Sequence, residues 1–387
     1  MRSTLLYLHR YIGLAMALFL ALAGLTGTIL AFHHELDEWL NPDLYHTGSS
    51  GPALPPDQLV ERVESAWPHM QVWYMEFPEE ADHAAMLAMV PRTNPETSEP
   101  WPEKPIVRYL DQVTGEQVGE RYWGDCCFSR RNFVPFMLEF HYNLTLPGNW
   151  GLWLMGLVAI AWVIDCFIAL LLTFPRGKPF WQKWQRAWKI KGGHSTRVNL
   201  DIHRASGLWL WLMLLPVAIS SVAMNLPEQV FKPGVSLASP VKPSVYAARG
   251  ELPAEELGVT GYGYGEAYQL AMQHARDLKL EEPITELYYS FEYNFYGAGF
   301  GDHASNQGNA WVFFHGTDGQ LLGKEIPGQG TLGERFFQLQ APIHGGRILG
   351  MPGRFLIAAL GLAIFVLSVT GVVIWWRKRQ ARQLRRV

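Results

Sequence analysis

The histidines of this chain recur at fixed places relative to its long apolar runs. The segments Leu8–Leu14 and Ile202–Leu208 share the pattern aliphatic-His-Arg-x-x-Gly-Leu, and each opens an apolar run of membrane length. Two further apolar runs follow His141 and His344, each after a Pro-Gly step. Histidine is costly near lipid and is a common metal ligand. The duplicated pattern therefore predicts metal-binding histidines between membrane helices.

His9 and His203 form the first predicted pair. If the two halves of the chain are parallel repeats, these two side chains lie at the same depth and face each other. Two neutral imidazoles on opposite sides of a porphyrin hold a six-coordinate b-type haem. Arg10, Arg204 and Arg197 are then placed to meet the haem propionates. The alternative is that both histidines are interfacial residues that only mark the helix starts.

The same symmetry predicts a second haem between His141 and His344, at the opposite membrane face. His33 and His34 are alternatives for one of these ligands, because His34 returns to nearly the same helix face as His9. The repeat itself does not support them, since its second half has no equivalent histidines. The other histidines are predicted to be surface residues without a partner: His46, His69, His83, His194, His274, His303 and His315.

Asp165 is the acidic residue that the pattern places deepest in a membrane run. It lies about ten residues, or roughly 15 Å, from the nearer end of its helix. A carboxyl at that depth must face protein or trapped water. Two interpretations are equally open, namely proton handling coupled to electron transfer, and a neutral hydrogen-bonded group that fixes packing.

Four apolar stretches are long enough to cross a bilayer, which takes about 20 residues. They divide the chain into seven segments. These are a first span with the N-terminus (1–32), a first outside domain (33–150), a second span (151–174), a basic loop (175–204), a third span (205–224), a second outside domain (225–352), and a fourth span with a basic tail (353–387).

Charge sets the predicted orientation of these segments. Residues 175–204 hold eight Lys and Arg against one acid, whereas 33–150 and 225–352 are both acidic. By the positive-inside rule the termini and the basic loop face the cytoplasm. The asymmetry is a membrane preference and predicts no nucleic-acid binding. Neither a P-loop nor an H-E-x-x-H motif occurs, residues 261–265 lack nucleotide-loop spacing, and the three cysteines form no zinc motif.

The two outside segments resemble each other in pattern. The first predicts a helix at 56–67, strands at 72–77, 84–90 and 106–110, and a turn at Val113–Glu116. The second predicts a helix at 265–278, strands at 284–293 and 309–315, and a turn at Thr317–Gln320. Alternating apolar residues bounded by Asp and Gly carry the strand assignments. Each segment is therefore expected to form an α+β domain.

Several of these motifs resemble the PepSY-associated transmembrane family. The N-terminal part matches in Leu8-His9-Arg10 with Gly13, in Thr26-Gly27, and in Asn41-Pro42. The C-terminal part matches in His344-Gly345-Gly346, Pro352-Gly353-Arg354 and Val369-Thr370-Gly371, and the two turns resemble the strand-turn-strand of a PepSY domain. The resemblance implies an integral α-helical membrane protein with four transmembrane helices in two parallel repeats and two periplasmic α+β PepSY-like domains.

Within that family the chain most resembles FoxB-type inner-membrane ferric-siderophore reductases. This implies two b haems, a bacterial inner membrane with both termini in the cytoplasm, and an electron donor that the sequence does not identify. The expected activity is electron transfer to a periplasmic ferric siderophore of hydroxamate type, with release of Fe(II). Trp73, Trp123 and Trp150 are candidates for lining the substrate cleft. The alternatives are a permease for the iron chelate and a non-catalytic signalling or binding protein.

Overall fold

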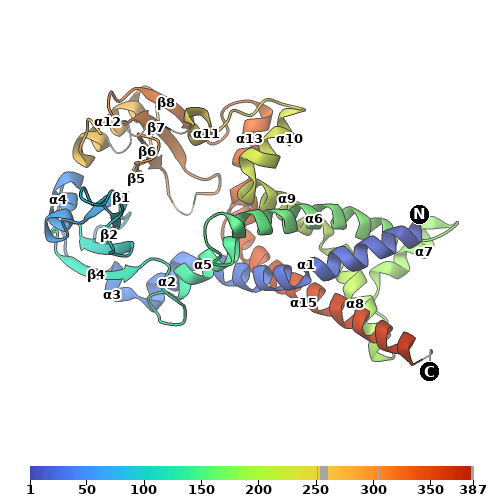
Figure 1. Ribbon diagram of the computed structural model, residues 1–387. Helices are drawn as coiled ribbons and strands as arrows, with labels where there is room; N and C mark the ends of the chain where they lie inside the picture. The colour runs from blue at the N-terminus through green and yellow to red at the C-terminus, as the bar shows by residue number, and fades with distance from the viewer. Residues whose placement is uncertain (251, 253–259, 303–304, 385–387) are drawn as a thin grey trace. The chain divides into compact units, whose positions relative to one another are not determined.

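The computed structural model describes residues 1–250, 252, 260–302 and 305–384. It divides into two compact units (Figure 1). The membrane unit is formed by Met1–Phe32, Met137–Gly234 and Leu339–Val387. The sheet unit is formed by His33–Phe136 and Val235–Gln338. Each unit therefore draws on both halves of the chain.

Long apolar helices make up the membrane unit. Its three longest are α1 (Arg2–Leu30), α6 (Trp150–Thr173) and α15 (Gly350–Gln383). In the described part of the chain three helices are long and apolar enough to cross a membrane, and a bent pair makes up to four. That pair is α8 (Ser195–Trp209) and α9 (Trp211–Asn225).

The bent pair corrects the prediction of one continuous span over 205–224. The two helices meet at an angle of 72° around Leu210. Two local features weaken a straight helix here. The Ser206 hydroxyl donates to the carbonyl of Ile202 at 2.6 Å, a contact that bends helices. Pro216, inside α9, has no N–H to donate to the preceding turn. His203 consequently lies inside α8 and not at the start of a span.

Small residues let α1 and α15 approach closely. A Cβ on Gly24 would lie 2.5 Å from the carbonyl oxygen of Gly361, and one on Gly361 would lie 2.4 Å from that of Gly24. The Thr28 hydroxyl in α1 donates to the carbonyl of Ala358 in α15 at 2.9 Å. Close backbone packing at small residues is a main source of helix association in membranes. The contact fixes these two helices against each other.

Short elements complete the chain between the spans and the sheet. They are α2 (His33–Leu40), α3 (Pro42–Tyr45), α5 (Phe133–Asn143), α7 (Phe180–Trp184), the 3₁₀ turn η1 (Gln185–Trp188), the π turn η2 (Pro227–Phe231), α10 (Lys232–Ser236), α11 (Val245–Arg249), α13 (Leu332–Gln338), α14 (Gln340–His344) and the 3₁₀ turn η4 (Arg347–Leu349).

The sheet unit contains one antiparallel sheet of eight strands in the order β4-β3-β2-β1-β5-β6-β7-β8. The sequence predicts a separate domain for each outside segment, but among the described residues each segment contributes four strands to this one sheet. The halves join where β1 pairs with β5, with Tyr74 opposite Tyr288. The pairing satisfies backbone groups that would otherwise form two exposed edges. The strands are β1 (Met70–Glu76), β2 (Ala84–Pro91), β3 (Ile106–Asp111), β4 (Gln117–Tyr122), β5 (Ile284–Ser290), β6 (Phe295–Phe300), β7 (Ala310–His315) and β8 (Leu321–Glu325).

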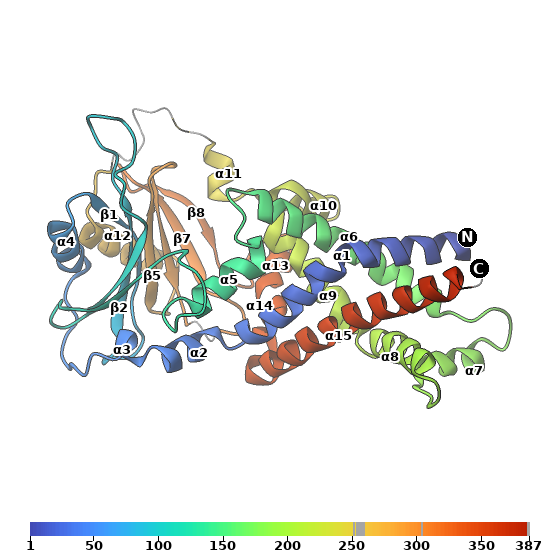
Figure 2. The same cartoon turned by 60° about the horizontal axis from the view of Figure 1, so that its bottom comes forward.

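The main core of the sheet unit lies under two helices, α4 (Pro56–Ala66) and α12 (Tyr264–Asp277), on the same face of the sheet (Figure 2). The side chains of β2 alternate between the two faces of the sheet. Ala85, Leu87 and Met89 join that core, whereas Ala84 and Ala88 pack on the opposite face with Leu44 of α3. Successive side chains of a strand point to opposite faces. The buried rows therefore hold the strands in register.

Candidate functional site

His9 of α1 and His203 of α8 face each other inside the membrane unit. Their ring centroids are 6.1 Å apart. Both residues sit within their helices, so the backbone at each is held by regular hydrogen bonding. The structure thus brings together the first pair predicted from the repeated His-Arg motif.

The Nδ1 atoms of both histidines in this pair are within hydrogen-bond distance of acceptor oxygens. His9 Nδ1 lies 2.8 Å and 3.0 Å from the two carboxylate oxygens of Asp165, and a carboxylate can only accept. His203 Nδ1 lies 3.0 Å from the Leu367 carbonyl and 3.0 Å from the Thr370 hydroxyl. The Thr370 hydroxyl donates its own proton to the Val366 carbonyl at 2.7 Å, so its oxygen accepts from His203.

The second predicted pair has the same design. His141 of α5 and His344 of α14 have ring centroids 6.1 Å apart. His141 Nδ1 lies 2.8 Å from the Thr26 hydroxyl, and His344 Nδ1 lies 3.0 Å from the Ser220 hydroxyl. Both hydroxyls donate to their own helix backbones, at the carbonyls of Leu22 and Val217. Their oxygens are therefore acceptors for the two imidazole N–H groups.

All four histidines are consequently held as the tautomer that carries its proton on Nδ1. The lone pair on each Nε2 then remains available to a metal ion. With metal–nitrogen bonds of about 2 Å, two imidazoles that share one metal have ring centroids about 6 Å apart. Both pairs have that spacing. Each pair can therefore supply two nitrogen ligands, and partners on Nδ1 are the usual support of metal-binding histidines.

A repeated Thr-Gly step supports one histidine of each pair. In α1, a Cβ on Gly27 would lie 3.2 Å from Cε1 of His141, and in α15 one on Gly371 would lie 3.3 Å from Cε1 of His203. The preceding residues, Thr26 and Thr370, bind Nδ1 of the same two imidazoles. The threonine thus orients the ring and the glycine makes room for it. The dipeptide recurs in both helices, but its role follows only from where the two imidazoles lie in the structure.

The other predicted site residues fall into three groups. Asp165 is buried and holds His9, so its carboxyl has a defined structural task. Arg204 donates to Asp201 at 2.7 Å and to the carbonyls of Arg186 and Ala187, which ties α8 to η1. Arg197 lies 4.0 Å from the same Asp201. Arg10 is half-buried beside His9 in α1.

His33 and His34 lie at the start of α2 in the sheet unit, with ring centroids 4.1 Å from each other. The rings that face each other in the second pair are those of His141 and His344. Two of the histidines predicted to lack a partner, His46 and His83, are instead brought together in the sheet unit. His303 lies outside the described residues.

The sheet unit also has a pocket of about 310 Å³. Its wall includes Trp67, Tyr122 and Arg108, whereas the predicted cleft residues Trp73, Trp123 and Trp150 are not among its described lining residues. The Arg108 guanidinium stacks 4.3 Å over the Trp67 ring and pairs with Glu120 at 2.7 Å. Burial lowers the pKa of Arg108, although Glu120 opposes that shift.

The fold and the histidine pairs define a helical membrane protein with an attached α+β sheet unit. A family model of the PepSY-associated TM region matches residues 6–378. The chain therefore belongs to the PepSY-associated transmembrane family. No curated protein matches the chain.

Proposed function

We propose that the protein is a haem-dependent ferric-siderophore reductase of the FoxB type. In this proposal His9 with His203, and His141 with His344, are the axial ligands of two b haems. The observation that carries it is the hydrogen-bonding of the four imidazoles. Each donates its Nδ1 proton, so four Nε2 lone pairs are left, in two pairs of rings whose centroids are 6.1 Å apart.

The glycines of the repeated motif also suit a large planar ligand. Gly13 and Gly207 stand four residues after His9 and His203, which places them on the same helix face. Apart from the neighbouring backbone of its own helix, a Cβ on Gly13 would meet no protein atom within 4 Å, and one on Gly207 would meet only Leu367 at 3.8 Å. Protein packing therefore does not require glycine at either position. A macrocycle against the histidine face explains why both motifs have it.

The two pairs are separated along the helix axis, in the direction across the membrane. His9 and Thr26, which holds His141, are 17 positions apart in α1, or about 25 Å along its axis. The hydrocarbon layer of a bilayer is about 30 Å thick. The pairs thus suit the two faces of the membrane, and haem bound there would supply one-electron transfer between them.

Charge favours an inner-membrane orientation with both termini in the cytoplasm and the acidic sheet unit in the periplasm. The basic loop over 175–204 lies between two spans, where the positive-inside rule applies best. Electrons from a cytoplasmic-side donor would then reach a periplasmic ferric hydroxamate. Such chelators hold Fe(III) far more tightly than Fe(II), so transfer of one electron releases the metal.

Stopped-flow reoxidation tests this function. Protein reduced in advance is mixed with a ferric hydroxamate in the presence of a ferrous-specific chelator. Reoxidation should coincide with formation of the ferrous complex, and His203→Ala or His344→Ala should slow both. The matched Ga(III) hydroxamate has the same shape but accepts no electron, so it should cause no reoxidation. Protein that stays reduced with ferric hydroxamates but is reoxidised by a quinone is instead a quinone-linked cytochrome.

A further inference from the structure

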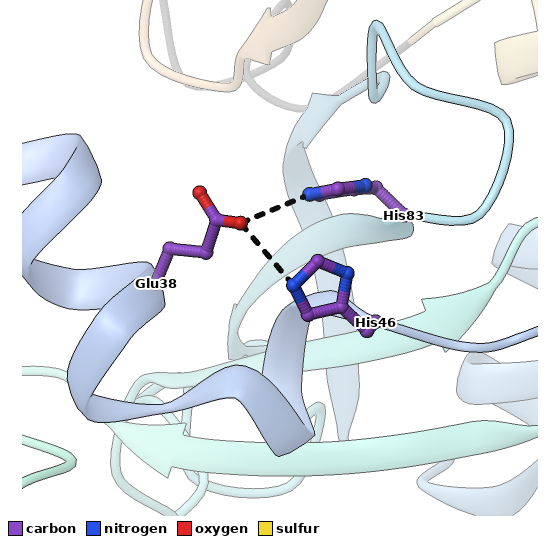
Figure 3. A group of neighbouring side chains, drawn as sticks. All are labelled: Glu38, His46 and His83. Atoms are coloured by element: carbon purple, nitrogen blue, oxygen red, sulfur yellow. Dashed lines mark ion pairs between the residues drawn. The ribbon is translucent and has the colours of Figure 1, made fainter.

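Three potential metal ligands meet in the sheet unit, and none of them belongs to the histidine pairs. Glu38 projects from α2, His46 follows α3, and His83 precedes β2 (Figure 3). Oε1 of Glu38 lies 3.2 Å from Nε2 of His46 and 3.5 Å from Nε2 of His83. A ligand atom from each residue lies within 4.8 Å of those of the other two.

The distances fit one small ion. A tetrahedral metal with bonds of about 2.0–2.1 Å holds its ligand atoms about 3.3 Å apart. The two separations between the carboxylate oxygen and the imidazole nitrogens, 3.2 Å and 3.5 Å, bracket this value. In Figure 3 the carboxylate of Glu38 points toward both imidazoles, and one of its oxygens is shared between them.

The backbone that carries the two histidines is fixed. His46 and His83 face each other in an antiparallel β-bridge, and the N–H of Thr47 donates to the carbonyl of Asp82 at 2.8 Å. The two rings are consequently held with centroids 4.6 Å apart. Ligands held on a rigid frame are a condition of specific metal binding.

The helix that carries Glu38 is anchored by its buried neighbour. Asp37 accepts from Arg121 at 2.6 Å, from Tyr45 at 2.6 Å and from Asn41 at 2.9 Å. These bonds link α2 to α3 and to β4. All three ligands therefore project from positions that the fold determines, although they come from separate elements of the sequence.

Asp82 supplies the support that metal-binding histidines usually have. Its carboxylate accepts from Nδ1 of His83 at 3.1 Å and lies 3.8 Å from Nδ1 of His46, beyond hydrogen-bond distance. A proton held on Nδ1 of His83 leaves its Nε2 as the ligand atom, and the Nε2 atoms of both histidines face Glu38. With Glu80 also 3.9 Å from His83, the group has more carboxylates than imidazoles, which favours a cation.

We propose that Glu38, His46 and His83 bind one divalent first-row transition-metal ion of the zinc and ferrous iron type. Imidazole and carboxylate ligands suit these ions, whereas magnesium and calcium prefer ligand sets made only of oxygen. Glu38 and His46 are partly open to solvent, so water can complete the coordination and the ion can exchange. The site shares no residue with the histidine pairs and does not depend on the reductase proposal.

Zinc binding to the full-length protein in detergent tests the site. After treatment with a chelator, equilibrium dialysis against Zn²⁺ should give a bound equivalent in the wild type that His46→Ala, His83→Ala and Glu38→Ala each lose. His69→Ala is the matched control, because His69 is another exposed histidine beside a carboxylate, Glu103 at 3.1 Å. It should keep that equivalent. Asp82→Asn should keep it with affinity reduced about 10–100-fold.

Thermal unfolding separates lost ligands from a lost fold. Zn²⁺ should raise the unfolding temperature of the wild type and of His69→Ala, because a ligand of the folded state stabilises it. The three ligand variants should unfold at the wild-type temperature without zinc and should not respond to it. Wild-type protein that binds no zinc at this site, ligand variants that bind as much as the wild type, or displacement of zinc by excess Mg²⁺ would overturn the proposal.

Discussion

The two histidine pairs have the same geometry but different electrostatics. In both pairs, the Nδ1 of each histidine is hydrogen-bonded to a membrane helix from the same half of the chain. Each ring faces a histidine from the other half. Three of the four Nδ1 atoms donate to neutral oxygens, those of Thr26, Ser220, and Thr370 with the Leu367 carbonyl. The fourth, on His9, donates to the carboxylate of Asp165.

Because of this difference, the two histidine pairs are expected to give bound metals different reduction potentials, although they arise from one repeated motif. A carboxylate acceptor makes an imidazole a stronger electron donor than a hydroxyl does. A more basic ligand stabilises the oxidised metal, so we expect the centre at His9 and His203 to have the lower reduction potential. Electrons would then run downhill from this pair to His141 and His344, which is the direction that the reductase proposal needs.

Removal of one histidine should have the largest effect. His203→Ala should abolish one low-spin haem signal and leave the other intact, and His344→Ala should do the reverse, because the two pairs share no ligand. Haem content and the electron paramagnetic resonance spectrum of the oxidised protein measure this. His274→Ala, in α12 of the sheet unit, is the control and should change neither signal. A single variant that removes both signals would contradict separate centres.

Enlargement of the supporting glycines should have the next largest effect. Gly371→Ala and Gly27→Ala would place a Cβ only 3.3 Å and 3.2 Å from imidazole Cε1 atoms, so the rings must shift. We expect each variant to broaden or weaken the signal of its own pair only. Gly234→Ala is the control, since a Cβ there meets nothing within 4 Å. Unchanged spectra in both glycine variants would mean that the ring positions are not critical.

Removal of the negative charge at Asp165 tests most directly whether charge makes the two histidine pairs differ in reduction potential. Asp165→Asn keeps an oxygen that can accept from His9 but removes the negative charge. We expect the potential of that centre to rise by on the order of 60 mV, which is a tenfold change for one electron. Thr370→Val is the matched control, because the Leu367 carbonyl still accepts from His203. Redox titration followed by absorbance measures both. Equal shifts in the two variants would show that charge is not the distinguishing feature.

The smallest expected effect concerns the stability of the sheet unit, where an aspartate begins a turn in each half of the chain, Asp111 in the first and Asp318 in the second. Burial acts to raise the pKa of Asp111, but donors from Ser49 and from the N–H groups of Val113 and Thr114 outweigh it and lower the pKa. The N–H of Gln320 likewise lowers the pKa of Asp318, which is exposed and screened by water.

A lowered carboxyl pKa stabilises the fold above the unfolded-state value of about 3.9 and ceases to do so as the pH falls through the folded-state value. Asp111→Asn should therefore cost about 1 kcal/mol at neutral pH, and the loss should fade below about pH 4. Asp318→Asn should cost less. Unfolding temperatures at several pH values measure both, and an effect of Asp111→Asn that does not depend on pH would contradict this account.

Sequence reasoning could find the four histidines because a duplicated His-Arg motif marks His9 and His203, and a Pro-Gly step before an apolar run follows each of His141 and His344. In the structure they meet in the predicted pairs. Helices α1 and α6 cover the first two predicted spans, whereas the third predicted span is bent near Leu210. The partner of Asp165 could not be predicted, because the register of α1 against α6 depends on packing over the whole helices. The recurring Thr-Gly step was visible in the sequence, but its task depends on where His141 and His203 point.

Contacts between distant segments account for the rest. The pairing of β1 with β5 joins two segments whose patterns are each complete alone, so the patterns do not reveal a shared sheet. The bend near Leu210 arises where α8 meets α9 inside one continuous apolar run. Glu38, His46 and His83 have no motif spacing, since a β-bridge and the anchoring of α2 bring them together.

The haem content of double histidine variants tests the central claim most directly. If His9 and His203 share one haem, the double variant His9→Ala/His203→Ala should lose one of two haems, no more than either single variant. The cross-pair variant His9→Ala/His344→Ala should lose both. A pyridine haemochrome assay and a reduced-minus-oxidised spectrum of the purified protein measure each. Wild-type protein without haem, or a cross-pair variant that retains a full haem, would contradict the account.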